Sequence, residues 1–190
     1  FSAKVWADYV YLDTDERRKF AQKPHEYLIE QVQRSVEAIS GNPESAKFRL
    51  NFNHPVKELI WVTPPSFIDR GSGGFSGAIQ ADQSWGQYAT NVDTARLVLN
   101  GHERFEKRSG TYFNYVQPFQ HHTGCPSGGV YVYSFALNPE KHQPSGTCNF
   151  SRIDNATLEL DLKAPTNIDD VSTMEIYAHN YNVLRIMSGM

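Results

Sequence analysis

The spacing of hydrophobic residues along most of the chain has the period of two that is typical of β-strands. Phe48, Leu50 and Phe52 alternate with polar residues, which predicts a strand with one buried face. Similar alternations or short apolar runs occur in five further segments, residues 57–62, 94–100, 130–137, 155–162 and 175–187. Residues 130–137 are apolar on both faces, as in a strand covered on both sides. With the turn signals between them, these segments predict about eight short strands, the pattern of a sandwich or jelly roll.

The N-terminal segment has a different pattern. Residues 3–12 are rich in Val, Tyr and Trp and predict a strand. Asp13, followed three residues later by Glu16, is typical of a helix N-terminus, and Pro24 ends the predicted short helix. Residues 25–39 are ambiguous, because their apolar positions fit a helix slightly better than a strand by periodicity alone.

A long segment, residues 66–91, has little periodicity and is rich in glycine and serine. Loops of this length are uncommon in compact domains and are often functional. Its aromatic residues Phe75, Trp85 and Tyr88 are candidates to anchor the loop or to form part of an outer surface.

The composition limits the classes of function. The chain has 190 residues with a formal net charge of −3, which fits one domain, or one domain with an appendage, and excludes a strongly basic nucleic-acid binder. No apolar run approaches the length of a membrane helix. A chain of this size can build a core without disulfides, so Cys125 and Cys148 are expected to be free thiols. Because the sequence begins at Phe1, directly in a strand-like segment, we expect it to be a fragment.

The histidines do not form a recognisable metal motif. The run that begins at His102 resembles the zinc-protease helix motif, but Glu106 occupies the position of the required second histidine. A cupin site needs a His-x-His pair, whereas His121 and His122 are adjacent and would point to opposite faces of a strand. Cys125 could pair with one of them as a nucleophile, although nothing in the sequence supplies an orienting group. We therefore predict no catalytic residue, no metal and no cofactor.

Five separated segments carry a resemblance to a known family: Asp8–Gln33, Asn51–Val62, Leu99–Gln120, His142–Leu160 and Tyr177–Met190. Together they span most of the chain outside the long loop. In this order they resemble the major capsid proteins of nucleocytoplasmic large DNA viruses, the group that includes phycodnaviruses and iridoviruses.

The resemblance implies an all-β fold, an eight-stranded antiparallel jelly roll that is the second of a double jelly roll. Residues 1–24 would be the last strand of the preceding roll plus a short linker helix from Asp13 to Gln22. Residues 25–190 would be the C-terminal roll, with the long loop at 66–91 facing outward. The resemblance also implies that residues 27–36 form the first strand of this roll, against the weak helical periodicity.

The function implied by the resemblance is structural. Three double rolls would form a homotrimer with a pseudo-hexagonal outline, and many trimers would tile an icosahedral capsid over an internal membrane. The implied partners are further copies of the protein and minor capsid proteins, without direct contact to nucleic acid and without insertion into the membrane. The implied location is the virion, assembled in the host cell cytoplasm.

Two groups of residues are candidate contacts between rolls or subunits. The first is Arg17 and Arg18 on the linker helix, because the guanidinium group is a rigid fork of donors suited to carbonyl and carboxylate acceptors. The second is the turn formed by Gln143, Pro144, Ser145 and Gly146. A carbohydrate-binding jelly-roll module is an alternative function, in which the aromatic residues of the 66–91 loop would stack on sugar rings. A cupin-type metalloenzyme is a third, against which the histidine spacing argues.

Overall fold

The computed structural model describes residues 3–39, 44–62, 92–126, 129–162 and 172–187. These residues belong to two compact units. The smaller unit comprises Phe1–Ile29 and Val183–Met190, and the larger unit comprises Glu30–Asn182.

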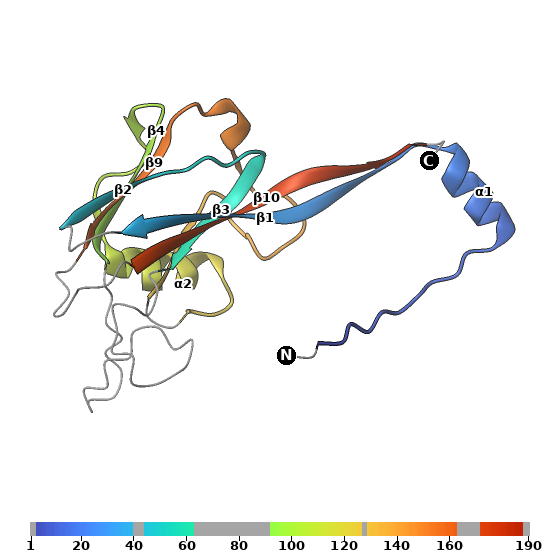
Figure 1. The fold of residues 1–190 in the computed structure, drawn as a ribbon, viewed down its shortest axis with the longest axis horizontal. Coiled ribbons are helices and arrows are strands. Elements are labelled where there is room, and N and C mark those ends of the chain that lie inside the picture. Colours follow the sequence, from blue (N-terminus) through green and yellow to red (C-terminus); the bar gives the residue numbers. More distant parts are fainter. Residues whose placement is uncertain (1–2, 40–43, 63–91, 127–128, 163–171, 188–190) are drawn as a thin grey trace. The chain divides into compact units, whose positions relative to one another are not determined.

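Two β-sheets form the larger unit (Figure 1). The first sheet has the strand order β1 (His25–Ile39), β10 (Ser172–Ile186), β3 (Pro55–Val62), β7 (Val130–Ser134), and β8 (Cys148–Asn149) also pairs with β3. The second has the order β2 (Ser45–Arg49), β9 (Ala156–Leu162), β4 (Val92–Leu99), β5 (His102–Glu103), and β6 (Arg108–Ser109) also pairs with β4. The pairs β3–β7, β3–β10, β2–β9 and β4–β9 are all antiparallel.

The predicted alternation is confirmed in the strands that supply the core. Along β9, Ala156, Leu158, Leu160 and Leu162 are buried on one face, and Phe48 on β2 faces the same core. The described residues contain ten strands, three of which are only two residues long, so the predicted count of about eight is not confirmed.

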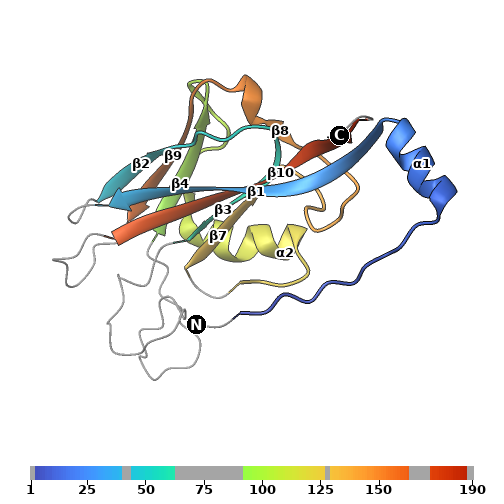
Figure 2. The ribbon, with the colours of Figure 1, turned by 45° about the vertical axis from the view of Figure 1, so that its right-hand side comes forward.

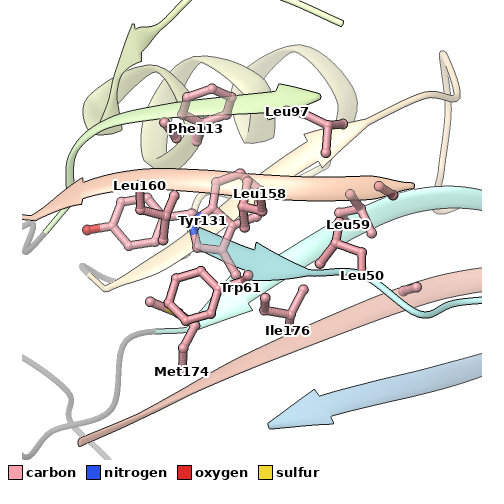
Figure 3. Close-up of a cluster of buried hydrophobic side chains, with 14 of the residues drawn as sticks. Leu50, Leu59, Trp61, Leu97, Phe113, Tyr131, Leu158, Leu160, Met174 and Ile176 are labelled. Atoms are coloured by element: carbon pink, nitrogen blue, oxygen red, sulfur yellow. The ribbon is translucent and has the colours of Figure 1, made fainter. Parts of the chain in front are cut away.

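The core lies between the two sheets and is centred on aromatic rings (Figure 3). Trp61 of β3 stacks on Tyr131 of β7 with ring centroids 5.9 Å apart, and it also packs against Phe113 at 5.3 Å. The Tyr131 hydroxyl accepts a hydrogen bond of 3.1 Å from the backbone N–H of Val92, at the start of β4. This bond joins the two sheets inside the core, because β4 and β7 belong to different sheets.

Strand β7 ends earlier than the apolar run predicts. It stops at Ser134, and Leu137 is 70% exposed. The backbone N–H groups of Phe135 and Ala136 both donate to the carbonyl oxygen of Lys57, at 2.8 and 3.1 Å, so the regular ladder cannot continue. The prediction of a strand over 130–137 is therefore wrong beyond Ser134.

A helical segment at residues 112–121 was not predicted. It consists of the π-helical turn η2 (Tyr112–Val116) and the helix α2 (Gln117–His121), which lies beside β7 (Figure 2). The buried side chain of Gln117 accepts a hydrogen bond from the backbone N–H of Ser134, and Asn114 donates to the carbonyl oxygen of Val130. These amides pair with backbone groups of β7, the last strand in its sheet order, and so protect an edge that would otherwise be open. A short 3₁₀ turn, η3 (Phe150–Arg152), follows β8.

The smaller unit contains the helix α1 (Thr14–Gln22), which begins where the sequence predicts. The Asp13 carboxylate accepts a hydrogen bond of 2.8 Å from the backbone N–H of Glu16. Residues 3–12, in contrast, form neither strand nor helix. The strand predicted there is absent because a strand needs a hydrogen-bonded neighbour, and none of the described strands pairs with this segment. Residues 25–39 are strand β1, as the resemblance implies.

Candidate assembly surfaces

The two candidate arginines lie on the exposed surface of α1. The Arg18 guanidinium is 3.5 Å from the Asp15 carboxylate, and both side chains are largely exposed. An ion pair this exposed contributes little to stability, so it does not hold Arg18 in one conformation. The Arg17 side chain is also exposed. Both guanidinium groups are therefore accessible at the surface of the smaller unit.

The candidate turn divides into two halves. Gln143 and Pro144 are exposed, whereas Ser145 accepts a hydrogen bond of 2.9 Å from the backbone N–H of Asn138 through its Oγ. Gly146 has a φ of +136°, and a Cβ there would lie 2.8 Å from a backbone carbonyl oxygen. Ser145 and Gly146 therefore hold the shape of their own loop, and Gln143, Pro144 and Gly146 are exposed at its surface.

The third candidate group, Phe75, Trp85 and Tyr88, lies outside the described residues, as does the whole 66–91 loop.

The structure adds an apolar surface that the sequence analysis did not identify. On β1, Val32 and Val36 are 65% and 45% exposed, and they share a face with Arg34, whose guanidinium binds the Glu175 carboxylate of β10 at 2.7 Å. β1 is the last strand of its sheet order among the described residues. Exposed apolar side chains on a terminal strand are typical of a surface that is covered by another protein element.

The other sheet has an outer face of opposite character, made of paired charges. Glu159 of β9 lies between Lys47 of β2, at 2.9 Å, and Arg96 of β4. The Lys107 ammonium binds the Asp161 carboxylate at 2.7 Å. Hydrogen bonds from Arg96 and then Lys47 lower the pKa of Glu159, and hydrogen bonds from Lys107 and Thr94 lower that of Asp161. Because each carboxylate has its own cation, this face does not require a charged partner.

The groups considered for catalysis are not brought together. Cys125 and Cys148 are free, as predicted, and the Cys125 thiol faces a backbone carbonyl oxygen at 3.9 Å. His121 ends helix α2 and His122 follows it, so the strand assumed for them is wrong. His121 faces a backbone carbonyl, and both ring nitrogens of His122 face carboxylates. His102 lies in a two-residue strand and not in a helix.

Within the described ranges, no group of three or more His, Cys, Asp or Glu side chains is arranged to hold a metal ion. In the same part of the chain, no helix has the length and apolar character needed to cross a membrane.

Comparison with known proteins shows which family the chain resembles. A family model described as the large eukaryotic DNA virus major capsid protein matches residues 16–190. The major capsid protein of Pyramimonas orientalis virus is 49% identical over 100% of this chain and 48% of its own length. That of Paramecium bursaria Chlorella virus 1 is 43% identical over 98% of this chain and 52% of its own length.

Solved structures agree with the sequence matches. A chain in the capsid of the same Chlorella virus superposes with a TM-score of 0.75 and 40% identity, over 96% of this chain and 54% of that one. The Faustovirus major capsid protein superposes with a TM-score of 0.71 at 13% identity, which supports the fold alone.

The fold and its matches define a jelly-roll domain of the kind found in virus shells. The chain belongs to the major capsid proteins of large eukaryotic DNA viruses. It spans about half the length of the curated relatives that it matches. The all-β jelly-roll fold and the family implied by the resemblance are thus both confirmed, whereas the count of eight strands is not.

Proposed function

We propose that this chain is the second jelly roll of a double jelly-roll capsid subunit, which associates into pseudo-hexagonal homotrimers that tile an icosahedral shell. One observation carries the proposal: 96% of the chain superposes on a subunit of a virus capsid at 40% identity. The function is structural, and its location is the virion.

The surface of the domain supports self-association. Val32 and Val36 expose apolar area on a terminal strand, which favours burial against another roll or subunit. On the outer face of the second sheet, the charged side chains pair with one another. The net charge of −3 does not favour contact with phosphates. The proposed partners are further copies of the subunit and minor capsid proteins. An internal membrane would lie near the shell, and assembly would take place in the host cytoplasm.

The N-terminal segment supports a preceding roll. Val5, Trp6, Val10 and Tyr11 are all at least 86% exposed and lie in a strand-forming sequence without a partner among the described strands. We assign residues 1–24 to the last strand of that roll and to the linker helix. Hydrogen exchange on the native subunit tests this assignment, because pairing slows exchange of the amides of residues 3–12. Fast exchange in the assembled protein would contradict it.

The mass of the native protein that contains this chain is the first measurement. Light scattering should give a stable trimer, and negative-stain images of the same peak should show hexagonal outlines. A monomer at every concentration would refute the proposal.

Arg17→Ala tests the contact assigned to the linker helix. An arginine buried in an interface contributes on the order of 1 kcal/mol or more, so the variant should dissociate more readily while its urea midpoint stays unchanged. Lys19→Ala, on the same helix, is the matched control. Equal loss of trimer and of subunit stability would contradict the assignment. The proposal of a contact extends to Arg18 and to the turn formed by Gln143, Pro144, Ser145 and Gly146.

A further inference from the structure

The larger unit contains a row of alternating carboxylates and imidazoles, which we name the His–Glu row. It runs from Glu30 of β1 through His179 of β10, Glu58 of β3 and His122 after α2 to Glu140 in the loop that follows β7. The four successive nitrogen-to-oxygen distances are 2.9, 3.1, 2.8 and 3.3 Å. The row therefore crosses five separate parts of the fold.

Further groups face both ends of the row. The Lys57 ammonium, which is fully buried, lies 3.0 Å from Glu30 and 4.9 Å from the ring centre of Tyr181. It is also 3.3 Å from the carbonyl oxygen of Lys141. The His142 ring lies 3.2 Å from Glu30, and at the other end Glu140 accepts hydrogen bonds from the backbone N–H and hydroxyl of Thr123.

The geometry at His179 calls for a proton on each ring nitrogen. A neutral imidazole has one N–H, and its other nitrogen carries a lone pair that repels a carboxylate. His179 Nε2 lies 2.9 Å from a Glu30 carboxylate oxygen and Nδ1 lies 3.1 Å from one of Glu58, whereas His122 Nε2 makes no hydrogen bond to the Glu58 oxygen 2.8 Å away. Only the imidazolium form can donate on both sides.

We propose that the His–Glu row is a proton-dependent clamp: when His179 is protonated it joins Glu30 of β1 to Glu58 of β3 and holds β1 on the sheet, and loss of this proton releases β1. The clamp lies entirely within the larger unit and does not depend on the proposed capsid function. The strand that the clamp holds is β1, the edge strand that carries the exposed Val32 and Val36. Release of the clamp would therefore alter that apolar surface.

The electrostatics of the row agree with this direction. The hydrogen bond to Glu58 raises the pKa of His179, and this outweighs the opposing effects of burial and of Lys57. The pKa of Glu30 is lowered, since Lys57 and His179 together outweigh its burial. The backbone N–H of Thr123 lowers the pKa of Glu140.

The sign of the pH dependence follows from these shifts. A histidine whose folded-state pKa is raised stabilises the fold fully below its ordinary value of about 6.5, and this contribution is lost as the pH rises through the folded-state value. The lowered pKa values of Glu30 and Glu140 keep these two carboxylates charged in mildly acidic solution. The clamp is thus closed in mildly acidic to neutral solution and opens on the alkaline side.

Hydrogen exchange of the purified chain between about pH 6 and about pH 9, corrected for the intrinsic rate at each pH, tests the clamp. The opening equilibrium of the amides in residues 30–37 should rise about tenfold for each unit by which the pKa of His179 is raised. The amides of β9, outside the row, serve as the internal reference and should change much less. A uniform change across β1 and β9 would overturn the proposal.

His179→Gln removes the titrating group and keeps a side chain that can donate one hydrogen bond. Its opening equilibrium in residues 30–37 should be high and nearly independent of pH, whereas the control His102→Gln should retain the dependence of the unmodified chain. The ring resonances of His179 in the unmodified chain provide a test that needs no variant. Titration at or below about 6.5 would overturn the proposal, even if His179→Gln does not fold.

Discussion

The hydroxyl of Tyr131 offers a sharp test of how the two sheets are joined. Tyr131→Phe removes one oxygen atom and leaves the stacking on Trp61 in place. The backbone N–H of Val92, which is bonded to that hydroxyl in the core, then has no acceptor there. Leaving a buried donor unsatisfied costs roughly 1–3 kcal/mol, and we expect about 2 kcal/mol because the Tyr131 ring is fully buried.

Urea unfolding and a thermal scan measure this loss. For a chain of this size, about 2 kcal/mol corresponds to a decrease in melting temperature of about 4–8 °C. Tyr9→Phe is the matched control, because the Tyr9 side chain is 78% exposed and the same chemical change should cost almost nothing. If the two variants agree within about 0.5 kcal/mol, the bond between the sheets does not stabilise the fold.

Three further changes test other features. Gly110→Ala should destabilise the fold by about 1–3 kcal/mol in urea unfolding, since a Cβ there would lie 2.2 Å from the carbonyl oxygen of Val92. Asp13→Ala should lower the stability of α1 by about 1 kcal/mol, seen as faster hydrogen exchange over residues 16–22, because it removes the N-cap bond. Glu159→Gln should reduce the loss of folding stability in acid. The pKa of Glu159 is lowered, chiefly by the hydrogen bond from Arg96. The contribution of Glu159 to the free energy of unfolding is therefore present above the ordinary carboxyl pKa and is lost as the pH falls through the folded-state value.

Each of these changes has a control in the same chain. Gly124→Ala places a Cβ where no atom lies within 4 Å, so its urea midpoint should stay unchanged. Asp8→Ala, in the segment before α1, should not affect exchange in the helix. Glu106→Gln alters an exposed carboxylate and leaves the contacts of Glu159 with Lys47 and Arg96 in place, so the loss of stability that depends on Glu159 should remain. A control that behaves like its test variant would refute the corresponding structural reason.

Most of the strands could be predicted from the sequence because their signal is local. The alternation of Ala156, Leu158 and Leu160 identifies one buried face without knowledge of what covers it. The start of α1 is equally local, since Asp13 and Glu16 are three residues apart. The ends of elements were less predictable: β7 stops at Ser134 because two N–H groups beyond it turn to a carbonyl on β3.

Other elements depend on distant partners and leave little local trace. The period of residues 25–39 fits a helix slightly better, yet the segment is a strand because β10 lies next to it in the sheet. Asn114 and Gln117 look like surface residues in the sequence, but they are buried because they pair with backbone groups of β7. The opposite case is residues 3–12, whose composition is that of a strand but which have no partner among the described strands.

The candidate contacts illustrate the same division. The sequence places Ser145 and Gly146 in a turn, but only the structure shows that they fix the shape of their own loop, through the hydrogen bond to Asn138 and the positive φ of Gly146. The exposed Val32 and Val36 could not be separated from core positions by pattern, because both lie in an ambiguous segment.

By itself, the sequence determined the family, the all-β class, the helix α1 and the buried faces of the main strands, because each depends on residues that are close together in the chain or on a resemblance spread over its length. Only the tertiary structure decided which polar residues meet. The His–Glu row joins Glu30 to His179 and three residues between them in the chain, and no local spacing relates them. Their proximity arises from strand order and from the path of the chain after β7, which bring distant charges to hydrogen-bonding distance.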